Sequence, residues 1–123
     1  MINFTGDRPI FLQGSESIED GILSGVYPEE SQIPSTTEIA ASCRINPATA
    51  LKGISLLVEE GIIYKKRGLG MFVVSGAKGK IREKRKREFY EKYVVQLIDE
   101  AKKLGFSEAE ITYLIRRGFE GEH

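Results

Sequence analysis

The stretch that decides the fold is IPSTTEIAASCRINPATALKGISLLVEEGIIYKKRGLGMFVV, residues 33–74. Ser35 and Glu38 have the spacing of a capping box, in which each side chain satisfies the other residue's free backbone N–H. A short helix is therefore predicted over Thr36–Cys43. Another helix is predicted to start at Asn46-Pro47, because Asn caps helices well and Pro is favoured at the first helical position. Only two residues separate the two predicted helices.

The helix that starts at Asn46 is predicted to end at Gly61 and to have one apolar side. Residues at helical spacing that should face a core are Ala50, Gly53, Ile54, Leu57 and Val58, which leaves Ala48, Thr49, Lys52 and Ser55 towards solvent. Residues 62–67 and 71–74 then have the pattern of two strands. Gly68 and Gly70 lie between them and permit the positive φ values that a tight hairpin needs.

Helical patterns also flank this stretch. Upstream, the apolar spacing of Phe11, Ser15, Ile18, Ile22 and Val26 predicts a helix over residues 11–26. Downstream, the small residues 75–79 predict a linker, helical spacing continues over residues 81–104, and Ser107 with Glu110 forms a second capping box that opens a final helix. We expect a mainly α fold with a small β-hairpin, divided into residues 1–76 and a two-helix segment at residues 77–123.

Composition excludes several classes of function. The 123 residues (13.8 kDa) contain one cysteine, Cys43, and one histidine, His123, so the chain has no disulfide framework and no histidine-based metal site or nucleophile. We expect no metal, no cofactor and no enzyme activity, since only unsupported carboxylates remain as catalytic candidates. No apolar stretch approaches the roughly 20 residues of a membrane span, and no signal peptide precedes the helices, so we expect a cytoplasmic protein.

Charge is distributed unevenly although the net charge is zero. Residues 1–77 hold 6 basic and 9 acidic side chains, and residues 78–123 hold 12 basic and 9 acidic ones. The sign of the net charge therefore changes near the predicted linker. The overall balance neither demands nor excludes a nucleic-acid partner.

The order of helix, turn, helix and basic hairpin favours DNA binding. The start of the second helix of such a pair can enter a major groove, while the preceding helix meets the backbone. The expected DNA-binding residues are Ser35, Thr36, Thr37, Asn46, Pro47, Ala48, Thr49, Lys52, Lys65, Lys66, Arg67, Gly68 and Gly70. Among these, Ala48 could contact a thymine methyl group, Lys52 a phosphate, and the hairpin cations phosphates or a minor groove.

Less specific interpretations exist for the same residues. Asn46 and Pro47 can simply start a helix, and a basic hairpin can be a solvated sheet edge. Cys43 is expected to be a small core residue, and Tyr64 and Phe72 are expected to pack within the hairpin. A protein-interaction module without specific DNA binding is the alternative from another class.

Residues 8–74 resemble the winged helix-turn-helix domain of the GntR family of bacterial transcription regulators. Seven segments carry the resemblance in the family's order and spacing: Pro9-Ile10-Phe11-Leu12-Gln13, Ile22-Leu23-Ser24-Gly25 followed by Pro28, Ile33-Pro34-Ser35, Glu38-Ile39-Ala40, Ile45-Asn46-Pro47-Ala48-Thr49, Leu57-Val58-Glu59-Glu60-Gly61-Ile62-Ile63 and Arg67-Gly68-Leu69-Gly70-Met71-Phe72-Val73. The short helical tail is similar to that of the YtrA subfamily, which carries a small dimerisation segment.

The resemblance implies a homodimeric regulator that binds an inverted-repeat operator in double-stranded DNA. Such proteins are commonly repressors, often of their own operon and of adjacent transporter genes. With so short a tail, an unidentified small-molecule effector would bind at the dimer interface or between the tail and the winged domain. The chain departs from the family at Thr37, where many members have arginine, and near Pro47 and Leu51, where many have a basic or polar residue. Operator preferences of relatives therefore do not transfer.

The tail contains an apolar stripe that is too large for an isolated helix to expose. Its expected dimerisation residues are Phe89, Tyr93, Leu97, Ile98, Ala101, Leu104, Ile111, Leu114 and Ile115. The stripe could form a twofold dimer seam or pack on the chain's own domains. The basic run at residues 80–87 could lie beside DNA, or it could form a solvated helix face paired with Glu83, Glu88 and Glu91.

Overall fold

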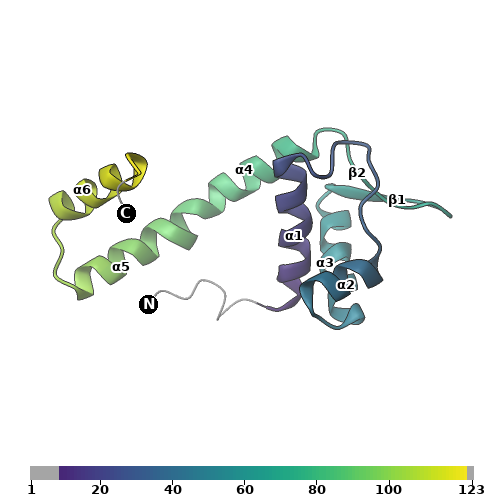
Figure 1. Cartoon of the computed structure of the whole chain (residues 1–123), viewed down its shortest axis with the longest axis horizontal. Helices are drawn as coiled ribbons and strands as arrows, with labels where there is room; N and C mark the ends of the chain where they lie inside the picture. The colour runs from purple at the N-terminus through teal and green to yellow at the C-terminus, as the bar shows by residue number, and fades with distance from the viewer. Residues whose placement is uncertain (1–8, 122–123) are drawn as a thin grey trace. The chain divides into compact units, whose positions relative to one another are not determined.

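The computed structural model describes residues 9–121 (Figure 1), so Arg8, His123 and the extreme ends of both predicted segments lie outside the described residues. The elements in chain order are α1 (Phe11–Ser24), α2 (Thr36–Cys43), α3 (Pro47–Glu59), β1 (Ile63–Lys66), β2 (Gly70–Val73), α4 (Ala77–Phe89), the π-helical turn η1 (Tyr90–Val94), α5 (Val95–Lys103) and α6 (Glu108–Phe119). The predicted class, mainly α with one small hairpin, is confirmed.

The described residues form two compact units, residues 9–86 and residues 87–121. The predicted linker at residues 75–79 is wrong, because Ala77 already begins α4 and its side chain is fully buried. Ile81, one turn later, is also fully buried in the core of the first unit. The first unit therefore includes the beginning of α4, beyond the boundary expected from composition.

Local capping fixes the ends of the first three helices. The Ser35 hydroxyl accepts a hydrogen bond from the Glu38 N–H (3.2 Å), and Glu38 Oε1 accepts one from the Ser35 N–H (3.0 Å), as predicted. Asn46 Oδ1 accepts from the Ala48 N–H at 2.8 Å and starts α3. The prediction for α1 was two residues too long, because Gly25 adopts a left-handed conformation (φ 87°) and ends the helix before Val26, which is exposed.

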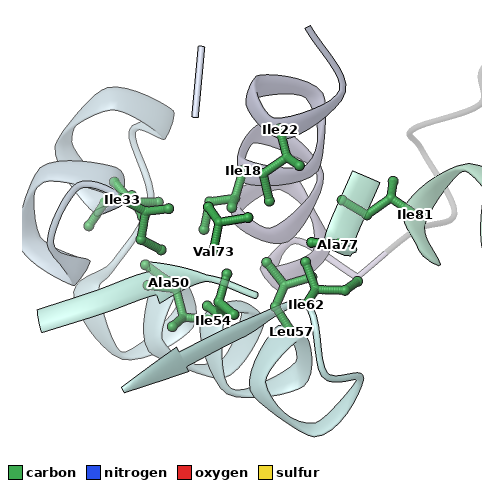
Figure 2. Packing of buried hydrophobic residues seen from close by; sticks show 13 residues of the cluster. Ile18, Ile22, Ile33, Ala50, Ile54, Leu57, Ile62, Val73, Ala77 and Ile81 are labelled. Atoms are coloured by element: carbon green, nitrogen blue, oxygen red, sulfur yellow. The ribbon is translucent and has the colours of Figure 1, made fainter. Parts of the chain in front are cut away.

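The core of the first unit lies between α1, α3 and the hairpin (Figure 2). Ile18 and Ile22 of α1 meet Ile54 and Leu57 of α3, and Val73 of β2 closes the cluster. Other buried members come from α2, the loops and the start of α4: Ile33, Ile39, Ala40, Ala50, Ile62, Ile63, Ala77 and Ile81.

Three packing predictions can be compared with this core. Val58 was expected to be buried but is 41% exposed, because the helix ends within one turn of it and turns that side to solvent. Cys43 packs against the core as a half-buried residue, as expected. Tyr64 and Phe72 lie opposite each other in the hairpin with ring centroids 6.2 Å apart, so their predicted packing role is confirmed.

Helices α1 and α3 approach each other closely at Gly53. A Cβ atom placed there would lie closer than 3.0 Å to the backbone carbonyl oxygen of Phe11, a separation that real Cβ atoms essentially never show. Glycine is therefore required by the helix–helix approach. Glycine is a weaker helix former than alanine, but it allows the backbones of α1 and α3 to pack closely.

The hairpin gains a third partner from the loop before α2. β1 and β2 pair antiparallel, with Tyr64 opposite Phe72 and Lys66 opposite Gly70. On the other edge of β2, the Glu30 N–H donates to the Val73 carbonyl (2.8 Å) and the Ile33 N–H donates to the Met71 carbonyl (2.9 Å). These bonds fix the hairpin to the segment that leads into α2.

The second unit is helical. The helix predicted over residues 81–104 begins earlier and is interrupted by η1, which separates α4 from α5. The Ser107–Glu110 capping box opens α6, as predicted. Among the helices of residues 9–121, none combines the length and apolar character that crossing a membrane requires.

Candidate nucleic-acid interface

A groove of about 980 Å³ runs along the outer side of α3, and we call it the α3 groove. The start of α2 contributes Ser35 and Thr36, α3 contributes Leu51 and Ser55, and the hairpin contributes Lys65. Gly70 and Leu69 line it at the hairpin tip. The groove therefore brings together three elements that the sequence predicted to act together.

The remaining predicted residues of the helix pair lie outside the lining of this groove. Asn46, Pro47 and Ala48 are exposed at the start of α3, and Thr37 is exposed in the first turn of α2. Thr49 was predicted to face solvent but is half-buried, because it lies next to Ala50, which is fully buried against the core. The exposed start of α3 thus consists of one amide and two small apolar side chains.

The three hairpin cations do not form one cluster. Side chains alternate along a strand, so Lys65 lies on the face that lines the α3 groove, whereas Lys66 lies on the opposite face. There the Lys66 ammonium lies 4.3 Å from the centroid of the Phe72 ring and 5.8 Å from that of Tyr64. Arg67 and Gly68 are exposed at the turn. Only Lys65 therefore brings a cation into the groove itself.

Side-chain hydrogen bonds hold the hairpin tip in place. Gln32 donates from Nε2 to the Leu69 carbonyl at 2.7 Å, and it occupies the space that a side chain at Gly70 would need. At the base, the Tyr64 hydroxyl donates to Glu30 Oε2 at 2.7 Å, and this hydrogen bond raises the pKa of Tyr64 above its usual value. The tip is thereby presented beside α3 in a defined position.

Lys52 is directed away from the groove. Its ammonium lies 4.5 Å from the centroid of the Phe11 ring, on the side of α3 that faces α1. This cation–π contact is compatible with a nearby phosphate, because the side chain remains exposed. Lys52 nevertheless does not contribute to the lining of the α3 groove.

The basic run at residues 80–87 is paired more extensively than either interpretation anticipated. Lys84 Nζ lies 2.7 Å from Glu19 Oε2 and 3.1 Å from Glu60 Oε1. Arg85 binds the other oxygen of Glu19 at 3.1 Å and also Asp20 at 2.7 Å. Of the partners predicted from the sequence, Glu83 lies 3.9 Å from Lys86. Two cations of the run thus neutralise acidic residues of α1 and of the α3 C-cap.

This ion-pair cluster surrounds a carboxylate that is only 2% exposed, that of Glu19. Burial disfavours the charged ammonium of Lys84, but its hydrogen bonds to Glu19 and Glu60 outweigh that penalty and raise its pKa. A buried carboxylate requires such partners, because its desolvation is otherwise costly. The cluster therefore anchors the start of α4 to the first unit.

The apolar stripe of the second unit is mostly exposed. Ala101 is buried and Ile111 is half-buried, whereas Phe89, Tyr93, Leu97, Ile98, Leu104, Leu114 and Ile115 are exposed, and Phe119 is 90% exposed. Phe89 and Tyr93 contact each other, with centroids 5.5 Å apart. These side chains form an exposed apolar surface of a kind that monomeric proteins rarely leave in contact with water.

Three residues with a role in this region, Leu51, Gln32 and Glu19, are not among the predicted site residues. Leu51 of α3 is exposed and lines the groove, although a leucine in an amphipathic helix is ordinarily expected in the core. Its position was nevertheless readable, since Leu51 falls outside the i, i+3, i+4 set of the apolar side. Gln32 and Glu19 act through partners 37 and 65 residues away, and no local pattern signals such contacts.

No group of three or more metal-ligating side chains occurs within the described part of the chain.

Comparison with known sequences finds transcription regulators. The chain is 33% identical over 75 residues to the HTH-type transcriptional regulator YurK of Bacillus subtilis, which covers 61% of this chain and 31% of YurK. It is 28% identical to the regulator YhcF of the same organism over 96% of both chains. The HTH-type transcriptional repressor YtrA of Bacillus subtilis is 33% identical over 57% of this chain and 54% of its own. The chain thus spans about a third of YurK but nearly all of YhcF. No family model matches it.

Comparison with solved structures gives a consistent result. A GntR-family transcriptional regulator from Bacteroides thetaiotaomicron has a TM-score of 0.72 and 36% identity, over 94% of this chain and 100% of that one. The DNA-binding domain of AraR, solved in complex with the operator ORX1, has a TM-score of 0.52 and 30% identity, over 55% of this chain and 81% of that one. The first unit therefore has a counterpart that binds operator DNA.

Proposed function

Because the chain belongs to the GntR family of transcriptional regulators, we propose that it binds a specific operator in double-stranded DNA and represses transcription. The observation that carries this proposal is the α3 groove, in which the start of α2, the exposed side of α3 and Lys65 of the hairpin converge. The AraR domain, which shares this fold, is bound to an operator.

The proposed roles follow from the position of each element. The exposed start of α3, with Asn46, Pro47 and Ala48, enters the major groove, where base edges are accessible. Thr49 and Lys52 support it from the flanks. The first turn of α2, with Ser35, Thr36 and Thr37, meets the DNA backbone through its hydroxyls and its helix N-terminus.

The hairpin is proposed to contact the DNA backbone beside the major groove. We propose that Lys65 and Arg67 bind phosphates and that Gly68 and Gly70, both with positive φ, let the tip approach closely. Lys66, on the other face of the hairpin, contributes to the local potential rather than to the groove itself.

We propose that the second unit makes the protein a homodimer. The exposed residues of the stripe would bury apolar surface against a second copy, whereas Ala101 is already buried within the chain. Two copies related by a twofold axis read an inverted repeat, whose half-sites lie about one helical turn, or a multiple of it, apart.

The finer assignment rests on the similarity to YtrA. We propose membership of the YtrA subfamily, a cytoplasmic location, and regulation of the protein's own operon and of adjacent transporter genes. A small-molecule effector is proposed as an additional partner, to be tested by adding candidate transporter substrates to the DNA complex.

The test selects fragments of the source genome that bind the purified protein at near-physiological salt and then footprints the best fragment. We expect a protected inverted repeat. Arg67→Ala should weaken binding to operator and random DNA alike and reduce the salt dependence, whereas Asn46→Ala should weaken operator binding selectively. Weak binding that salt abolishes, with no enriched sequence, would contradict the proposal and favour a protein-interaction module.

A further inference from the structure

The exposed side of α3 carries an apolar strip. Ala48 and Leu51 follow one another at i, i+3 spacing and therefore share a face of the helix, on which the hydroxyl-bearing Ser55 lies one turn later. Leu51 is 53% exposed, whereas its neighbours Ala50 and Ile54 are buried in the core. Ala48 is exposed one turn before Leu51, beside Pro47. This strip of methyl and methylene groups lies on the side of α3 that we propose enters the major groove.

The same surface is poor in groups that read guanine. Helices α2 and α3 together contain a single cation, Lys52, and its ammonium lies over Phe11 rather than in the groove. Neither helix contains arginine, the residue that most often binds guanine in a bidentate manner. Asn46 uses its amide oxygen to accept from the Ala48 N–H, so it offers base edges mainly its Nδ2 donor. Bidentate recognition of guanine by arginine is therefore not available to these two helices.

The proposed occupant of this surface, DNA, is anionic. Lys65 lines the α3 groove and Arg67 is exposed at the hairpin turn. The Glu38 carboxylate, which also lines the groove, accepts a hydrogen bond from the Ser35 N–H. In the major groove of DNA, the only apolar group on a base edge is the 5-methyl group of thymine. Exposed apolar side chains on α3, with Lys65 in the groove beside Leu51, are thus complementary to a stretch of duplex that presents thymine methyl groups.

We propose that Leu51, together with Ala48, reads thymine methyl groups, so that the operator half-site has A·T pairs where α3 contacts it. This inference rests on the proposed function and specifies which sequences the site prefers. Each methyl group that Leu51 covers should contribute about the transfer free energy of one methylene, which corresponds to roughly fourfold in Kd.

The test replaces thymine by deoxyuridine, one position at a time, in a synthetic duplex that spans the footprinted operator. Deoxyuridine lacks the methyl group but keeps the hydrogen-bonding edge of thymine. We expect at least one position in each half-site at which the substitution raises the Kd of the wild-type protein roughly fourfold, as measured by fluorescence anisotropy. In Leu51→Ala the Kd should rise for the thymine duplex and no longer respond to deoxyuridine at that position.

The matched control is Ser55→Ala, which changes a neighbouring residue of the same face without removing apolar contact. It should keep the full deoxyuridine effect. Circular dichroism checks that each variant is folded, which is expected because alanine is a good helix former. A specific footprint with no deoxyuridine effect, or an effect that persists in Leu51→Ala, would overturn the inference while leaving the proposed function intact. The absence of any protected operator would overturn both.

Discussion

The substitution Gly53→Ala tests the closest approach between helices in the first unit. A Cβ at this position would lie closer than 3.0 Å to the Phe11 carbonyl oxygen, and ordinary contacts begin at 3.4 Å. The obstacle is backbone in the first turn of α1, so it cannot rotate away as a side chain could. Helices α1 and α3 would therefore have to separate by at least about 0.4 Å.

The free energy of this change has two opposing parts. Alanine favours the helix over glycine by roughly 0.5–1 kcal/mol. Overpacking a tight core typically costs about 1–3 kcal/mol, and separation of α1 from α3 would also loosen Ala50 and Leu57, which are fully buried on the same helix. We expect the cost to prevail, with a net destabilisation of roughly 1–2 kcal/mol.

A matched control exists in the same chain. Gly79 lies in the first turn of α4, and a Cβ there would have no neighbour within 4 Å. Gly79→Ala should therefore gain only the helix propensity and raise stability by roughly 0.5–1 kcal/mol. Both variants would be compared with wild type by urea denaturation, and thermal midpoints should move in opposite directions, by roughly 4–8 °C per kcal/mol. A Gly53→Ala protein as stable as the Gly79→Ala protein would refute the close approach of α1 and α3.

Three further predictions concern other parts of the chain. Lys84→Met should lower the free energy of unfolding by roughly 1–3 kcal/mol, because it removes one of the cations that neutralise buried Glu19; urea denaturation that matches wild type would contradict this. Backbone and side-chain hydrogen bonds of the capping box lower the pKa of Glu38, so its stabilising effect is present above pH 4.5 and is lost as pH falls through the lowered value. The stability difference between wild type and Glu38→Gln should accordingly vanish in acid, and a difference that grows there would be inconsistent with the lowered pKa. Leu97→Asp should give a monomer at concentrations at which wild type sediments as a dimer, whereas Lys103→Asp, which lies outside the stripe and about a third of a turn away from Leu97, should remain dimeric. A dimeric Leu97→Asp protein would argue against the stripe as the interface.

The helix pair could be predicted from the sequence because its determinants are local. The Ser35–Glu38 box and the Asn46-Pro47 start act over two or three residues, and both hydrogen-bond patterns are present in the structure. The hairpin was equally readable from two glycines between strand patterns. The bounds of α2 and the start of α3 are therefore predicted to the residue, whereas the apolar spacing of α1 continues to Val26, past Gly25, whose left-handed conformation ends the helix.

The start of α4 could not be predicted because its determinants are distant in sequence. In the sequence, Ala77 looks like part of a small-residue linker, and Ile81 looks like the beginning of a polar helix. Both are buried in the core of the first unit, which only the folded chain reveals. Glu19 appears as a polar residue beside Ile18 within the apolar pattern of α1. Its partners Lys84 and Arg85 lie 65 and 66 residues away, so only the folded chain explains why a carboxylate can be buried there.

This pairing also bears on how a protein of zero net charge would bind DNA. Lys84 and Arg85 look like free cations in the sequence, but they are engaged with acidic residues of the first unit. In the proposed complex the hairpin cations would contact phosphates, and each neutralised phosphate contributes only about −0.9 to the slope of log K against log salt. Non-specific affinity should consequently be low and the salt dependence shallow. Discrimination among sequences must come instead from base contacts, and on α3 the exposed groups available for such contacts are largely apolar, with Leu51 the largest of them.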